Sequence, residues 1–114
     1  MSVKEAHIDS GAFAEQATLT SVIGTHPKAK ILAVLLSEGR DISINDIAEQ
    51  AGMSRSTVYD YIDDLIDFGV VVQTRKVGKS PLYEINRNSE AAKNLARFER
   101  ALIHKQAESL ENSE

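Results

Sequence analysis

The stretch that decides the fold is INDIAEQAGMSRSTVYDYIDDLIDFGV, residues 44–70. Its first part carries apolar residues at the spacing of one helix face, namely Ile44, Ile47, Ala48 and Ala51. Ser43 precedes this helix as an N-cap, and Gly52 follows it with a residue type that favours a left-handed helix end. Ser54 can then cap a second helix after a short link. The pattern predicts a helix, a tight turn and a helix, which is a helix-turn-helix unit.

The second helix of this unit is amphipathic and ends at Gly69. On a wheel of about 100° per residue, one side gathers the residues expected in the core, Val58, Tyr61, Ile62, Leu65 and Phe68. The opposite side gathers Ser56, Asp60, Asp63 and Asp67, with Asp64 on a flank. The helix therefore presents a polar start and an acidic later half.

The flanking segments complete a small domain. Residues 13–24 predict one short helix stopped by Gly24, and residues 25–39 predict a helix capped by Thr25 or His26, with Pro27 in its first turn. Ile42 suits a very short extended segment. Residues 70–86, VVVQTRKVGKSPLYEIN, predict two strands joined by a turn at KVGKS, and a hairpin directly after a helix-turn-helix is a wing.

The last segment, residues 88–110, predicts a long helix capped by Asn88 or Ser89. Its apolar stripe consists of Ala91, Leu95, Phe98 and Leu102. Such a helix can close the core of its own chain or pair with its copy in another chain. Because the three-helix core is already complete, we favour a dimer interface.

Composition bounds the class of protein. A chain of 114 residues is expected to form one domain. It has no cysteine, which excludes disulfides, thiolate metal sites and cysteine redox switches. The longest apolar run, ILAVLL, is too short to span a bilayer, and the first residues lack the pattern of a signal peptide. These features predict a soluble, cytoplasmic protein without membrane contact.

The charge distribution says more than its total. The net charge of −4 weighs mildly against nucleic acid. Residues 75–87, however, hold four basic side chains against Glu84 alone, a local charge of +3. This positive tip is suited to phosphate contact, although an ordinary solvated hairpin would look the same.

The residues offer little for catalysis. His7, His26 and His104 are scattered, with no carboxylate at metal-ligand spacing, and there is no phosphate-binding glycine loop or serine nucleophile motif. Asp63 and Asp64 are adjacent, so on a helix they point about 100° apart. We expect no catalytic residue, no metal site and no cofactor.

Residues 27–87 resemble the winged helix-turn-helix transcription regulators of archaea and bacteria, the MarR-like and ArsR-like group, and in particular small archaeal members with a TRKVG…YEIN-type wing. The resemblance implies a mainly α fold with a small β-hairpin, and a homodimer whose recognition helices enter the major groove of an inverted-repeat operator in double-stranded DNA. The flanks resemble no known family, and we expect the chain to divide into an N-terminal arm with a short helix (1–24), the winged domain (25–87) and a C-terminal helix for dimerisation (88–114).

Carried over by position, the resemblance places the DNA-facing start of the recognition helix at Ser54, Arg55, Ser56, Thr57 and Tyr59. It places the wing contacts, to the backbone or minor groove, at Arg75, Lys76 and Lys79. Arg55 has the geometry to read guanine, and Ser54 with the helix N-terminus can bind phosphate. Asp60 departs from the pattern, since many relatives have Arg or Lys there. An aspartate at this position removes a phosphate or guanine contact and adds repulsion from the DNA. The alternatives are that Asp60 accepts a hydrogen bond from a cytosine amino group or pairs near Arg55 or Ser56.

Three functions therefore stand in competition. The favoured one is a dimeric, sequence-specific DNA-binding regulator, most simply a repressor. The second is a winged-helix protein-interaction module whose acidic helix meets a basic partner. The third is a sensor with a small-molecule cavity beside the terminal helix, for which no residue identifies an effector.

Overall fold

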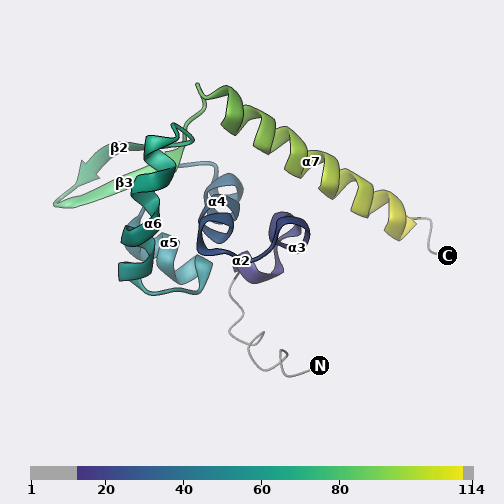
Figure 1. Cartoon of the computed structure of the whole chain (residues 1–114), viewed down its shortest axis with the longest axis horizontal. Helices are drawn as coiled ribbons and strands as arrows, with labels where there is room; N and C mark the ends of the chain where they lie inside the picture. The colour runs from purple at the N-terminus through teal and green to yellow at the C-terminus, as the bar shows by residue number, and fades with distance from the viewer. Residues whose placement is uncertain (1–12, 112–114) are drawn as a thin grey trace.

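The computed structural model describes residues 13–111, so the first half of the predicted N-terminal arm and residues 112–114 lie outside the described residues. The chain is mainly helical with one small antiparallel sheet and a long C-terminal helix, as predicted (Figure 1). Its elements are α2 (Phe13–Gln16), α3 (Thr18–Ile23), α4 (Pro27–Glu38), β1 (Ile42–Ser43), α5 (Ile44–Ala51), α6 (Arg55–Asp67), β2 (Val71–Val77), β3 (Ser80–Ile85) and α7 (Glu90–Glu111).

The N-terminal segment forms two short helices, so the prediction of one helix over residues 13–24 was wrong. Ala17 interrupts it with extended backbone (φ −71°, ψ 150°). The hydroxyl of Thr20, a buried side chain, reaches the carbonyl oxygens of Ala14 and Ala17, with a 3.0 Å contact to the latter. The break lets Ala14, Ala17 and Leu19 all face the core, which a continuous helix would not do.

Helices α4, α5 and α6 pack together around one core, where Ile31, Leu35, Ile47, Val58 and Ile62 are almost fully buried. Local signals set the start of α4, because His26 Nδ1 accepts from the backbone N–H of Lys28 at 3.0 Å and Pro27 takes the first helical position. His26, rather than Thr25, is therefore the cap.

The turn between α5 and α6 is built by local hydrogen bonds. Gly52 is left-handed (φ 71°) and donates to the Glu49 carbonyl, while the Met53 N–H donates to the Ala48 carbonyl at 3.1 Å. This pair of bonds is a Schellman motif, and its usual apolar contact is supplied by Met53, which packs on the core. The predicted helix-turn-helix is thus confirmed.

The same motif ends α6 and corrects one expectation. Gly69 (φ 80°) donates to Ile66 O and Val70 donates to Leu65 O, at 2.8 and 3.1 Å. The chain turns so sharply that Val70 supplies the apolar contact with the core. Phe68, predicted in the core, is instead 77% exposed; it is the C-cap residue, the last with helical backbone before the turn at Gly69.

The sheet has the strand order β1-β3-β2, so the predicted hairpin gains Ile42–Ser43 as a third strand. Ile42 pairs with Tyr83, and both side chains are buried. The wing turn is Gly78–Lys79, with Gly78 at φ 64°. Strand β2 contains an irregularity between Gln73 and Arg75, which pair with Tyr83 and Leu82, so Thr74 is the extra residue of a β-bulge.

Helix α7 begins at Ser89, whose hydroxyl accepts from the Ala92 N–H at 3.1 Å, so Ser89 rather than Asn88 is the cap. Its most buried side chains lie in its first turns, although Thr18 of α3 also donates to Gln106 Oε1 near its far end, at 2.7 Å. Ala92 is buried, and Leu95 packs against the small cluster of Ala17, Leu19 and Ala33. Beyond this point the helix runs along α3 and on past the body of the domain (Figure 1). Within residues 13–111, none of the helices combines the length and apolar character needed to cross a bilayer.

Candidate nucleic-acid interface

The polar start of α6 is tightly organised. The Ser54 hydroxyl accepts from the Thr57 N–H at 3.1 Å and lies 3.1 Å from Ser56 Oγ and 2.9 Å from Thr57 Oγ1. Capping therefore occupies Ser54, and the three hydroxyl groups form one cluster. Ser54 and Ser56 remain exposed, so the cluster presents hydroxyl groups and helix N–H groups to solvent, a combination that suits an anion.

The next residues of α6 point outward. Arg55 and Asp60 are exposed, and Tyr59 is 47% exposed. Among the described residues, neither Arg55 nor Asp60 has a hydrogen-bond or ion-pair partner. The intrahelical pair considered for Asp60 does not form, because the side chain lies more than one turn from Arg55 and Ser56 does not reach it. Arg55 and Asp60 both remain available to an external partner.

The other aspartates of α6 differ from one another. Asp64 pairs with Lys28 of α4, with Nζ and Oδ2 at 3.0 Å. Asp63 lies near Tyr83 of the wing. The pKa of Tyr83 is raised, chiefly by burial and then by the charges of Tyr59 and Asp63. This proximity places the side of α6 that carries Tyr59 and Asp63 beside strand β3.

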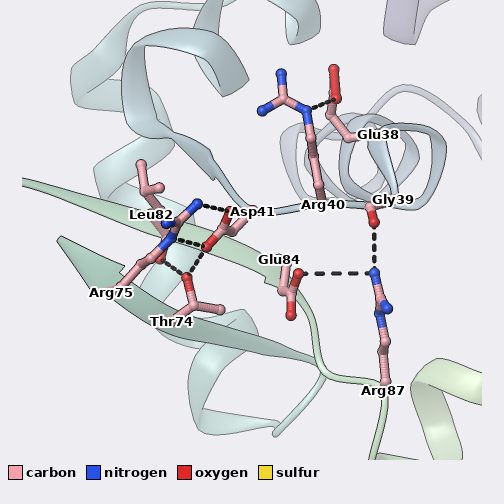
Figure 2. Close-up of polar contacts among 9 residues, drawn as sticks. All are labelled: Glu38, Gly39, Arg40, Asp41, Thr74, Arg75, Leu82, Glu84 and Arg87. Carbon is pink, nitrogen blue, oxygen red and sulfur yellow. Dashed lines mark hydrogen bonds and ion pairs between the residues drawn. The ribbon is translucent and has the colours of Figure 1, made fainter. Parts of the chain in front are cut away.

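The wing residues predicted to bind DNA fall into two groups. Lys76 and Lys79 are exposed and have no partner within the described part of the chain. Arg75 is held by Asp41, with Nε to Oδ2 at 2.9 Å and Nη2 to Oδ1 at 3.2 Å, while Thr74 donates to Oδ2 of the same carboxylate (Figure 2). The structure thus separates Arg75 from the two lysines.

Electrostatics reflect the strength of this contact. Hydrogen bonds from Arg75 and then Thr74 lower the pKa of Asp41 from its ordinary 3.8 to about 2, and the carboxylate in turn raises the pKa of Arg75. The Asp41 side chain is only 14% exposed, whereas that of Arg75 is 64% exposed. Sequence reasoning missed Asp41, because no spacing signal links it to an arginine 34 positions away.

The corner that carries Asp41 is held by a second arginine. Arg87, between the sheet and α7, donates from Nη2 to the Gly39 carbonyl at 2.6 Å and lies 4.0 Å from Glu84 (Figure 2). Arg40 pairs with Glu38 at 3.4 Å. Contacts from the wing and from the start of α7 therefore meet at residues 38–41.

The residues predicted for the dimer interface do not share one environment. Ala91 is exposed, Phe98 is 43% exposed and Leu102 is half-buried, while Leu95 packs on its own chain. Leu110, which extends the stripe less regularly, is exposed, as are apolar side chains on the neighbouring helices and along α7 that the sequence did not single out, namely Phe13, Val22, Ile23 and Ile103.

A cavity of about 290 Å³ lies between the N-terminal helices, α4 and α7. Phe13, Ala17 and Ile103 form its apolar part, and Ser37 and Glu99 are among its polar lining residues. Burial raises the pKa of Glu99. Within residues 13–111, no cluster of three or more histidine, aspartate or glutamate side chains is arranged to hold a metal ion.

Comparison with known proteins agrees with this architecture. Residues 28–78, from α4 to the wing turn, match the family model described as HTH domain. A 43-residue stretch is 46% identical to a UPF0735 ACT domain-containing protein of Clostridium perfringens, covering 38% of this chain. The chain spans only 30% of the length of that relative.

Three solved structures share the fold. The AntR antimony-specific transcriptional repressor aligns with a TM-score of 0.56 at 17% identity, covering 95% of this chain and 86% of its own. CouR, a transcriptional repressor bound to a 23-mer DNA duplex, aligns with a TM-score of 0.56 at 18% identity. The alignment covers 97% of this chain and 78% of CouR. The homodimeric DNA-binding domain of a possible ArsR-family regulator from Mycobacterium bovis aligns with a TM-score of 0.52 at 23% identity. The alignment covers 100% of this chain and 93% of that domain.

The match over residues 28–78 spans the three core helices and the first strand of the wing, and the three structures align over 95%, 100% and 97% of the chain. Residues 28–78 therefore resemble the HTH domain in sequence, and the chain has the winged helix-turn-helix fold of the three solved structures.

Proposed function

We propose that this protein is a sequence-specific, double-stranded DNA-binding transcriptional regulator that acts as a homodimer. Residues 25–87 would form the DNA-binding domain, and residues 88–114 would contribute to dimerisation. The protein would act by binding rather than by catalysis. The observation that carries the proposal is a set of exposed cations without a partner among residues 13–111, Arg55 on the recognition helix and Lys76 and Lys79 on the wing, together with the polar start of α6.

The chemistry of these residues suits a duplex. An arginine that has no protein partner can donate two hydrogen bonds to guanine in the major groove, which carries about 1–3 kcal/mol of discrimination. Exposed lysines on the wing suit phosphates, whose contacts supply affinity without sequence information. The hydroxyl cluster around Ser54 adds donors at a helix N-terminus, where phosphate binds favourably.

Exposed apolar surface supports the homodimer. Six of the nine large hydrophobic side chains that are exposed in the described residues belong to α2, α3 and α7: Phe13, Val22, Ile23, Phe98, Ile103 and Leu110. Exposed apolar side chains on helices that contact one another are typical of an association surface. We infer that α7 pairs with a second copy together with the N-terminal helices, and that Phe98 and Ile103 contribute more than Leu95.

Repression is the simplest mode of action, because a dimer that occupies two half-sites blocks access to the DNA beneath it. Two of the similar structures are named as transcriptional repressors, and a third is homodimeric. In a dimer of this class the half-sites lie about 34–36 Å apart, one turn of the double helix.

The decisive test is selection of binding sites from random duplex DNA with the full chain at two salt concentrations. Enrichment of an inverted repeat with half-sites one turn apart supports the proposal. Failure to enrich any sequence at low salt contradicts it. In that event a protein-interaction module becomes the better hypothesis, because α6 has an exposed acidic face formed by Asp60, Asp63 and Asp67.

A further inference from the structure

The Asp41–Arg75 contact bridges the sheet from one edge to the other. Asp41 precedes β1, Arg75 lies on β2, and β3 runs between them. Ile42 and Tyr83 are paired and buried, so Asp41, one residue earlier, is on the opposite, outer face of the sheet. The guanidinium of Arg75 therefore crosses the outer face of β3 to reach the carboxylate (Figure 2).

The direction of this side chain matters for function. Arg75 pairs with Leu82, whereas Asp41 stands next to Ile42, which pairs with Tyr83, one position nearer the base of the wing. Arg75 thus extends away from the turn at Gly78–Lys79 and back toward the body. Its Nε and one Nη nitrogen are both used by the carboxylate.

The β-bulge makes this arrangement possible. In a regular strand, consecutive side chains point to opposite faces, so Thr74 and Arg75 could not both bind one carboxylate. The extra residue in β2 re-aims them, and both donate to Asp41 Oδ2. The guanidinium of Arg75 and the hydroxyl of Thr74 thus both bind the Asp41 carboxylate, whose side chain is only 14% exposed.

We propose that Asp41, Thr74 and Arg75 form a clamp that fixes the direction of the wing, so that Arg75 is a positioning residue and phosphate contact is left to Lys76 and Lys79. This inference rests on the proposed function, in which the wing contacts DNA. It replaces the expectation, drawn from the resemblance, that Arg75 itself binds DNA.

The alternative is that Arg75 is a phosphate contact that Asp41 partly neutralises. The two arrangements predict opposite changes in DNA affinity for one variant. Asp41→Asn removes a negative charge near DNA, which strengthens binding if Asp41 only masks Arg75. If Asp41 anchors a clamp, the same change weakens binding because the wing must be ordered on DNA, at a cost of about two- to tenfold in affinity.

The experiment compares Asp41→Asn, Arg75→Gln and the double variant, with the selected duplex, over a range of salt. The clamp predicts that both single variants weaken binding, that the double variant is no weaker than either, and that the salt slope stays close to that of the parent. Lys79→Ala is the reference for a phosphate contact and should lower the slope by about one. Glu84→Gln is the matched control, because it removes a carboxylate near Arg75 without touching the clamp.

A second measurement does not depend on DNA. Amide hydrogen exchange should become faster in β2 and β3 of both single variants, relative to α4–α6 in the same protein, and unchanged in Glu84→Gln. Tighter binding by Asp41→Asn, or wing exchange equal to that of the parent in both variants, overturns the clamp. If the parent binds no duplex, the proposed function fails, while the exchange rates still decide whether the clamp exists.

Discussion

Lys28 Nζ lies 3.0 Å from Asp64 Oδ2, so the first turn of α4 is tied to the later half of α6. This contact gives Asp64 a structural role and separates it from the aspartates that face outward. It also explains why an acidic residue is tolerated on a helix whose start is suited to DNA, since its charge is partly compensated by a cation of the same chain.

Asp64→Asn should lower the free energy of unfolding only slightly. The two side chains are 33% and 54% exposed, and ion pairs of this kind contribute up to about 1 kcal/mol. Urea denaturation of the single variants and of Asp64→Asn combined with Lys28→Met gives the coupling energy. A coupling well above this range would mean that the pair holds α6 more firmly than its exposure suggests.

Asp60→Asn should strengthen binding to duplexes of any sequence, because it removes a repulsive charge from the outward face of α6. Binding to the selected site and to a scrambled duplex, measured in parallel, distinguishes this from base reading. If Asp60 accepts from a cytosine, the variant loses affinity for the selected site while gaining it for the scrambled one. Asp67→Asn, also exposed but later in the helix, serves as the control for charge alone.

Arg55→Ala should relax base preference at one position of each half-site, at a cost of about 1–3 kcal/mol. Lys76→Ala and Lys79→Ala should instead weaken all sequences alike and reduce the salt dependence. Site selection repeated with each variant checks both expectations. Equal losses on every sequence for all three variants would falsify a base-reading role for Arg55.

Phe98→Glu combined with Ile103→Glu should yield a folded monomer, because both side chains are substantially exposed. Leu95→Asp should instead lower stability, by more than about 2 kcal/mol, since Leu95 packs on its own chain. Sedimentation and thermal melting separate the two effects. Arg97→Glu is the control for adding a carboxylate to α7, and a monomer from that variant would argue against an apolar interface.

The Asp41 clamp should weaken in acid. The folded pKa of Asp41 is about 2, below the ordinary value of 3.8, so its stabilising contribution is present above that ordinary value. It is lost as the pH falls from about 4 toward 2. The difference in urea stability between the parent and Asp41→Asn should be constant above about pH 5 and shrink below pH 4. A difference that does not change over this range would show that the carboxylate does not carry the contact.

The helical core could be predicted because its signals are local. Pro27, Ser43, Gly52, Ser54 and Gly69 each act within a few residues, by capping a helix or by allowing a left-handed turn. The starts of α4, α5 and α6 and the turn of the wing therefore follow from neighbouring residues alone. Phe68 was misplaced because a helix wheel gives the direction of a side chain but not where the core ends, and Phe68 is the C-cap of α6.

The candidate site was predicted only in part. The polar start of α6 and the basic wing are visible in the sequence, but a formal charge does not say whether a side chain is free. Arg55, Lys76 and Lys79 are free in the described structure, and Arg75 is not. Likewise, the apolar stripe on α7 is visible in the sequence, but the sequence does not show that Leu95 packs on its own chain.

The sequence by itself thus determined the helix-turn-helix, the wing and a long terminal helix, because caps, glycines and apolar spacing act over a few residues. Only the tertiary structure decided that Asp41 meets Arg75, that Lys28 meets Asp64, and that apolar side chains remain exposed on α2, α3 and α7. The physical reason is that these contacts join residues far apart in the chain. Their formation depends on how the elements pack and, at Thr74, on one extra residue in a strand.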